Sequence, residues 1–221
     1  MPSTPPEARP SLRLPAVALR AVIVLVWALG LGFVRYGDPG ALLQSHPVPR
    51  KLQSPEVDRV ILVVFPDVPA SIGDSIWNDL AARYDISGSV VVRAAPLDPS
   101  SWNPVRHQFG AERATDSMLR TSPVFEAGRT VVVGLTTGDL YIESMSWNWA
   151  FAVRRNGAAL VSMARMHRRF ELDGARSLMR KMVLRELGFL AWGLPATDDP
   201  GDLMYRDVLD LHDLVAMSDD L

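Results

Sequence analysis

A strand pattern, a helix pattern and a second strand pattern in close succession limit the folds open to this chain. Residues 58–66, DRVILVVFP, form a compact valine-rich run that is typical of a buried strand. Residues 70–86 repeat apolar side chains every fourth residue, which predicts a helix. A second strand pattern, GSVVVRAAPL, begins at residue 88. This order within about 40 residues predicts a parallel strand pair with a crossover helix, and therefore an α/β fold.

The rest of the chain extends this pattern. Strand signals return in residues 129–144, RTVVVGLTTGDLYIES, and in residues 157–166, GAALVSMARM. Residues 172–192 carry the longest helical pattern, which a Gly-Leu-Pro stop ends, and residues 208–217 predict a short last helix. We expect a small, twisted, mostly parallel sheet with packed helices, followed by this long helix and the C-terminal helix. Residues 99–128 predict one or two helices whose bounds the sequence does not define.

The N-terminal part of the chain has the features of an export segment. Residues 1–13 are proline-rich and are expected to be disordered, whereas residues 14–36 are hydrophobic and follow several arginines. We expect a signal anchor that crosses the membrane once and leaves the domain outside the cytoplasm. Cleavage of this segment as a signal peptide, which would secrete the domain, is the alternative. Residues 37–55 form a proline-rich linker, and residues 56–221 form the domain.

Composition excludes several classes of function. The net charge is −2, with 23 Lys and Arg against 25 Asp and Glu, so no overall basic field attracts nucleic acid. The absence of cysteine excludes disulfides, a thiolate metal site and a cysteine nucleophile. The sequence contains no G-x-S-x-G motif, which is the motif that would indicate a serine hydrolase. The partners that remain are the membrane, through residues 14–36, and a peptide or protein.

Residues 185–205, RELGFLAWGLPATDDPGDLMY, contain the chemistry-bearing segment. In a helix, an H-E-x-x-H motif directs two imidazoles at one zinc ion while the glutamate reaches the metal-bound water. Here Glu186 is present, but the two ligand positions hold Arg185 and Phe189. A guanidinium keeps its charge and has no free lone pair, and a phenyl ring has no ligand atom. The spacing of a zinc motif is therefore present without its ligands.

Several short segments together resemble the metzincin metallopeptidases, and most closely their archaemetzincin branch. They are GLTTGDLY at residues 134–141, GAALVS at 157–162, ELG and GLP around the end of the long helix, and LMY at 203–205. The resemblance implies a metzincin-like fold in which Met204 is the turn methionine and Glu186 takes the general-base position. It places the third zinc-ligand position at Pro195, or at Ala196 if one residue is inserted. The family's zinc-binding histidines and its cysteine cluster are absent from this sequence.

Two hypotheses of function follow. The first is a membrane-anchored pseudo-peptidase that has no zinc or other cofactor and acts as an extracytoplasmic binding or interaction module. The second is an active metallopeptidase whose zinc site is built from other residues, namely Glu186, His167 and the acids between residues 198 and 202. A catalytic zinc ion needs three protein ligands that converge on one point, so the geometry around Glu186 separates the two hypotheses.

Arg185 shares a helical face with apolar residues, so we expect its charge to be buried and to need a partner. The predicted partner is a carboxylate of the following loop, namely that of Asp198, Asp199 or Asp202.

Three further features carry weaker functional signals. Trp147 and Trp149 alternate along one strand face and are candidate cleft aromatics, with core packing as the alternative. His167 lies in a basic segment, RMHRRF, that would contact an anionic lipid or a partner, or else is only a charged loop. The acids between residues 198 and 220 lack the spacing of a calcium loop and predict a solvated acidic face.

Overall fold

The computed structural model describes residues 55–122, 125–145, 149–206 and 208–221. The predicted N-terminal segments, 1–13 and 14–36, lie outside the described residues, as do Trp147 and all of the predicted linker 37–55 except its last residue. In the part of the chain that is described, none of the helices combines the length and the apolar character that crossing a membrane requires.

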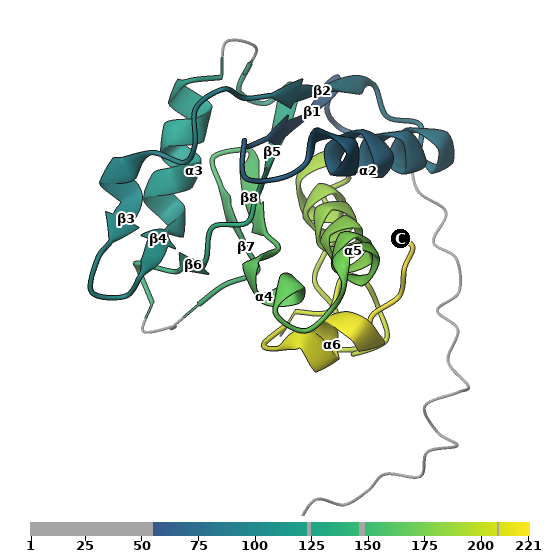
Figure 1. Ribbon diagram of the computed structural model, residues 1–221. Helices are drawn as coiled ribbons and strands as arrows, with labels where there is room; N and C mark the ends of the chain where they lie inside the picture. Colours follow the sequence, from purple (N-terminus) through teal and green to yellow (C-terminus); the bar gives the residue numbers. More distant parts are fainter. Residues whose placement is uncertain (1–54, 123–124, 146–148, 207) are drawn as a thin grey trace, which may run out of the picture. The chain divides into compact units, whose positions relative to one another are not determined.

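A five-stranded sheet forms the centre of the domain, in the order β2-β1-β5-β8-β7 (Figure 1). The strands are β1 (Arg59–Val64), β2 (Gly88–Val92), β5 (Thr130–Thr136), β7 (Ala152–Arg155) and β8 (Ala158–Ser162). All neighbours in this sheet are parallel except β7 and β8, which form an antiparallel pair at one edge. The predicted parallel pair with its crossover helix is confirmed by β1, α2 (Ala70–Arg83) and β2.

Helices cover both faces of this sheet (Figure 1). Because successive strand residues point to opposite faces, β1 contributes to two separate hydrophobic cores. Val60, Leu62 and Val64 pack in the core formed with α2 and α5 (Leu172–Ala191). Ile61 and Val63 pack in the core formed with α3 (Ala111–Arg120) on the other face. The fold is therefore a three-layered domain, and the predicted α/β class with a mostly parallel sheet is confirmed.

The shorter elements flank these layers. A second sheet joins β3 (Trp102–Asn103), β4 (Gln108–Gly110) and β6 (Leu140–Tyr141), and a 3-10 turn, η3 (Pro99–Ser101), precedes it. The predicted strand of residues 157–166 was wrong at its end, because Ala164–His167 form the short helix α4. The chain turns there because the Ser162 hydroxyl accepts a hydrogen bond from the Ala164 amide. The last helix, α6 (Leu211–Ala216), begins three residues later than predicted because Asp210 caps it.

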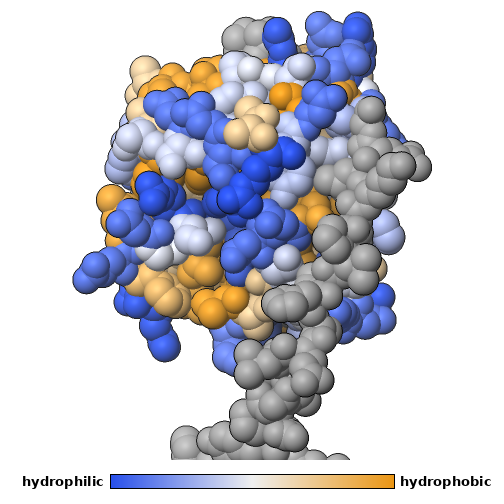
Figure 2. Space-filling view, turned by 90° about the vertical axis from the view of Figure 1, so that its right-hand side faces the viewer, coloured by the Kyte–Doolittle hydropathy of each residue, from blue (hydrophilic) through white to orange (hydrophobic). Residues whose placement is uncertain are grey.

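The C-terminal segment packs against α5 through a buried lysine. The Lys181 ammonium donates hydrogen bonds to the carbonyl oxygens of Val215, at 3.2 Å, and Met217, at 2.7 Å. It also lies 3.3 Å from a carboxylate oxygen of Asp219. Figure 2 shows the face of the molecule that lies on the right-hand side of Figure 1. In the part that is not grey, hydrophilic residues fill much of the middle of this face, and hydrophobic residues lie in separate groups. The end of the chain thus packs on α5, which carries the zinc-motif spacing of residues 185–189 and which we call the motif helix.

Substitution of a central strand residue tests this architecture. Leu135 of β5 is fully buried, so Leu135→Ala leaves a cavity and should lower the free energy of unfolding by about 2 to 5 kcal/mol. Leu172→Ala makes the same chemical change at an exposed residue of α5 and should change it by less than about 0.5 kcal/mol. Urea unfolding followed by circular dichroism measures both values. Equal losses for the two variants would contradict the described burial.

Candidate functional site

The motif helix α5 ends in a left-handed turn. Trp192 is its C-terminal cap, and Gly193 has a φ of +58°, a conformation that glycine adopts without strain. The Leu194 amide then donates a hydrogen bond of 2.9 Å to the carbonyl oxygen of Gly188. This turn sends the chain back toward the loop that carries Met204. The predicted third ligand position, Pro195, lies in this connection with its side chain exposed to solvent.

The loop with Met204 packs closely on the motif helix. Met204 is fully buried, and a Cβ atom added at Gly188 would lie only 2.6 Å from its sulfur atom. Glycine at this position of the helix therefore allows the loop to approach. The loop is closed by two main-chain hydrogen bonds of 2.9 Å, from Thr197 to Met204 and from Arg206 to Thr197.

Arg185 lies beneath this loop with only 7% of its surface exposed. Its Nη2 donates hydrogen bonds to the carbonyl oxygens of Tyr205, at 2.7 Å, and Arg206, at 3.3 Å, and its Nε donates to Tyr205 at 3.2 Å. Its Nη1 donates to Glu186 Oε1 at 3.0 Å. Burial lowers the pKa of Arg185. The negative charge of Glu186 raises this pKa, and the positive charge of Arg154 lowers it further. The main-chain oxygens and Glu186 accept hydrogen bonds from this buried guanidinium and so compensate for its burial.

The predicted burial of Arg185 is confirmed, but the predicted kind of loop partner was wrong. Among the described residues, the partners of Arg185 in the loop are main-chain carbonyl groups rather than carboxylates. Asp198 forms an ion pair of 2.8 Å with Arg206, and the carboxylates of Asp199 and Asp202 accept hydrogen bonds from amides of their own loop. A loop that bends over a helix presents its carbonyl oxygens there, and sequence spacing does not reveal this geometry.

Glu186 is almost completely buried, with 2% of its surface exposed, and both of its carboxylate oxygens are engaged. Oε1 accepts the hydrogen bond from Arg185, and Oε2 accepts one of 3.1 Å from Nη1 of Arg154, a residue of the edge strand β7. The guanidinium of Arg154 also lies 3.6 Å from the ring centre of Phe189, and that of Arg185 lies 5.0 Å from it. We refer to Arg154, Arg185, Glu186 and Phe189 as the arginine–glutamate cluster.

The residues at this position do not fit a catalytic zinc ion. Zinc requires ligand atoms with free lone pairs, and neither a guanidinium nor a phenyl ring supplies one. Both oxygens of Glu186 already accept hydrogen bonds from arginines, and two positive charges lie beside it. The cluster therefore fills the space between the motif helix and β7 with ion pairs and cation–π contacts.

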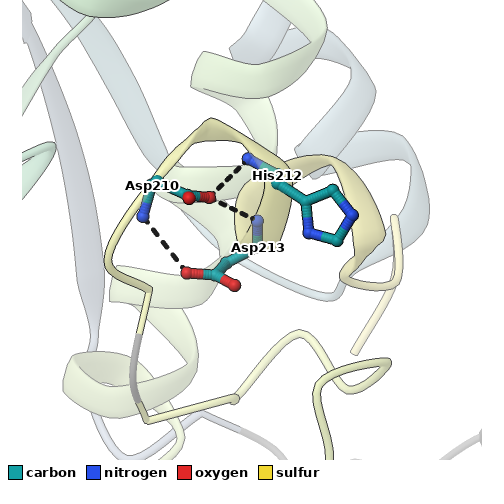
Figure 3. Close-up of side chains that lie close together, drawn as sticks. All are labelled: Asp210, His212 and Asp213. Carbon is teal, nitrogen blue, oxygen red and sulfur yellow. Dashed lines mark hydrogen bonds between the residues drawn. The ribbon is translucent and has the colours of Figure 1, made fainter. Parts of the chain in front are cut away.

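Among the described residues, one group of three potential metal ligands lies within 4.8 Å, namely Asp210, His212 and Asp213. It includes none of the residues that the alternative hypothesis requires, which are Glu186, His167 and the acids between residues 198 and 202. Figure 3 shows that the two carboxylates are used to cap α6. Asp210 accepts hydrogen bonds from the amides of His212 and Asp213, and Asp213 accepts one from the Asp210 amide. The grouping is explained by this capping box.

One hollow adjoins the cluster, and a second hollow shares Trp149 and Phe151 with it as a common wall. The apolar hollow has a volume of about 400 Å³ and is lined by Met145, Leu209 and other apolar residues together with Arg154, Arg185 and Arg206. The basic hollow has a volume of about 420 Å³ and is lined by Arg165, Arg168, Arg169, Asp210, Leu211 and His212 besides the shared wall.

The two aromatic rings of the shared wall meet edge to face at 4.9 Å. The predicted cleft aromatic Trp149 therefore lies at both hollows.

Sequence reasoning did not identify Arg154 as part of the site. Its signal is the alternation along β7, which places Ala152 and Arg154 on one face of the strand. That face meets the motif helix only because β7 pairs with β8 at the edge of the sheet next to α5, a long-range arrangement that the local pattern does not contain.

Comparison with known proteins identifies the fold. No protein-family model matches the sequence, and no curated protein matches it. Three solved structures are similar over most of their length. The archaemetzincin of Archaeoglobus fulgidus, crystallised with malonate, has a TM-score of 0.59 and 19% identity over 73% of this chain and 94% of its own. A zinc-dependent peptidase from Methanocorpusculum labreanum has a TM-score of 0.61 and 20% identity, over 72% and 94%.

The archaemetzincin of Methanopyrus kandleri has a TM-score of 0.58 and 24% identity, over 79% of this chain and 92% of its own. These likenesses show that the chain has an archaemetzincin-like fold, as the sequence resemblance implied. At such identities they show the fold alone.

The arginine–glutamate cluster should behave as one unit. Glu186→Gln leaves two guanidinium groups without their shared carboxylate and should lower the free energy of unfolding by about 3 to 5 kcal/mol. Glu171→Gln is the matched control, because Glu171 is exposed at the start of α5, and should change it by less than about 0.5 kcal/mol. Urea unfolding measures both values.

The double variant Arg185→Met/Glu186→Gln tests the pairing itself. It should be less destabilised than the sum of its two single variants by about 0.5 to 3 kcal/mol, because the second change removes the charge that the first one strands. Strictly additive losses would contradict the ion pair.

Proposed function

We propose that this protein is a peptidase-fold protein without zinc peptidase activity that acts as a binding module. The observation that carries the proposal is the state of Glu186, which lies between two arginines and has both oxygens engaged. In a zinc peptidase with this motif, the glutamate must reach a metal-bound water as general base. Here Arg185 and Phe189 occupy the positions from which ligands would hold the metal.

The apolar and basic hollows support a binding role. Concave sites with apolar walls and a few charged side chains are the usual form of ligand sites in proteins. Trp149 and Phe151 form a rigid wall between the hollows, and such aromatic residues often contribute most to the affinity of an interface. The peptidase fold would thus provide a cleft that binds a peptide or protein segment without cleaving it. We further propose that residues 14–36 anchor the protein in a membrane, with the domain outside the cytoplasm.

Metal analysis of the full-length chain, purified in mild detergent, tests the loss of zinc. After incubation with zinc and removal of free metal, we expect well below one zinc ion per chain, because the donor set does not fit the ion. A quenched fluorescent peptide mixture should remain uncleaved. The zinc-dependent peptidase of Methanocorpusculum labreanum, prepared in the same way, is the positive control for both measurements.

One zinc ion per chain that is lost in Glu186→Ala, together with peptide cleavage, would refute this proposal and establish the alternative metallopeptidase. Zinc that persists in Glu186→Ala but is lost in His212→Ala would instead locate the metal at the start of α6, away from the arginine–glutamate cluster.

A further inference from the structure

Positive charge is concentrated around the two hollows, although the whole chain has a net charge of −2. Among the described residues, the side chains that line them include six arginines and one acidic residue, Asp210. The carboxylate of Asp210 is directed to the amides at the start of α6, so it caps that helix. The arginines come from β7, from α4 and the turn after it, from α5 and from the loop after Met204, and only the tertiary structure brings them together.

Acidic partners within the fold neutralise this charge only in part. Glu186 is shared by Arg154 and Arg185, so those three residues together retain one positive charge. Asp139 is shared in the same way by Arg165, through two hydrogen bonds of 3.0 and 3.1 Å, and by Arg168, at 3.6 Å. Arg169 is exposed and forms no ion pair with another described residue. Arg206 forms an exposed ion pair of 2.8 Å with Asp198. Among the described residues, both hollows therefore still present guanidinium groups whose charge is not balanced.

Exposed apolar side chains accompany these charges. Met145 is 56% exposed and Leu209 is 52% exposed, and both line the apolar hollow. Large apolar residues exposed at the rim of a concave surface are typical of a site that is covered by a ligand or partner. The ring of Trp149, 4.6 Å from the guanidinium of Arg165, connects the apolar part of the surface with the basic part.

We propose that the two hollows bind an acidic segment of a partner protein, in which carboxylate side chains flank an apolar residue. The apolar residue would enter the apolar hollow, and the carboxylates would pair with Arg168, Arg169 and Arg206. Guanidinium groups are planar and match the two oxygens of a carboxylate. This inference rests on the proposed function, because it requires that the cleft binds a segment without cleaving it.

The geometry favours a protein segment over other anions. The arginines line two hollows of about 400 Å³ instead of one flat face, which suits side chains that enter one at a time rather than a flat membrane surface. Nucleic acid binds along a continuous basic surface, and the chain as a whole is acidic. The mixture of apolar and basic lining matches an amphipathic peptide.

Fluorescence anisotropy with two labelled octapeptides tests the proposal on the full-length chain in mild detergent. In the first peptide glutamate alternates with leucine, and in the second glutamine replaces each glutamate. The glutamate peptide should bind at least about tenfold more tightly, because each charged hydrogen bond contributes to affinity. The difference should decrease as salt is raised from about 0.05 M to about 0.5 M, because salt screens exposed charges.

Neutral variants of the arginines locate the site. Arg168→Gln/Arg169→Gln and Arg206→Gln should each weaken binding of the glutamate peptide about tenfold and leave the glutamine peptide unaffected. All three side chains are largely exposed, so the variants should keep the unfolding midpoint of the unaltered chain. Arg120→Gln is the matched control, because Arg120 is exposed on α3 at the opposite face of the sheet. It should bind both peptides like the unaltered chain.

Equal affinity for the two peptides, no binding of the glutamate peptide, or unchanged binding in the arginine variants would each overturn the inference. Tighter binding to vesicles of phosphatidylserine than to vesicles of phosphatidylcholine, if it is lost in Arg168→Gln/Arg169→Gln and is not competed by the glutamate peptide, would overturn it in favour of a lipid surface. These outcomes leave the proposed loss of zinc chemistry unaffected, because zinc content and peptide cleavage decide that separately.

Discussion

The position of one carboxylate, that of Glu186, determines how the motif helix contacts the rest of the domain. It lies between Arg185 of the same helix and Arg154 of the edge strand, so it links α5 to β7. Arg185 in turn binds the carbonyl oxygens of the loop after Met204. A zinc ion held at the predicted ligand positions would join α5 only to the connection that follows it, whereas this structure joins α5, β7 and the loop after Met204. Here charged hydrogen bonds join them, and each charge has a partner, which buried charges require.

The backbone and the core explain how the fold forms although Arg185 and Phe189 stand at the motif's ligand positions. The glycine turn at Gly193 and the close approach of Met204 to Gly188 depend on backbone conformation and packing, and neither requires a metal. The core on the α3 face of the sheet lies apart from the site, and the core on the α5 face includes Leu184, Leu187 and Leu203 through apolar packing alone. An archaemetzincin-like fold can therefore form with ion pairs at the position of the zinc motif.

The arginine–glutamate cluster also determines the charge of the apolar hollow beside it. A metal site with neutral imidazoles would activate a water, whereas the arginine–glutamate cluster leaves an unbalanced positive charge beside apolar walls. The shared wall of Trp149 and Phe151 and the arginines of α4 extend this surface beyond the original motif. A basic, apolar cleft on an otherwise acidic chain is an arrangement suited to recognition.

The sequence by itself determined the α/β fold, the parallel pair β1 and β2, and the loss of ligands at Arg185 and Phe189. The fold and the strand pair follow from local periodicity, which residues close together in the sequence produce. The absence of ligands follows from the chemistry of the two side chains themselves. The sequence did not reveal Arg154, the carbonyl partners of Arg185, or the gathering of arginines from four elements. These depend on which strand lies at the sheet edge and how a loop bends over a helix. Such contacts join residues far apart in the sequence, so only the tertiary structure decided them.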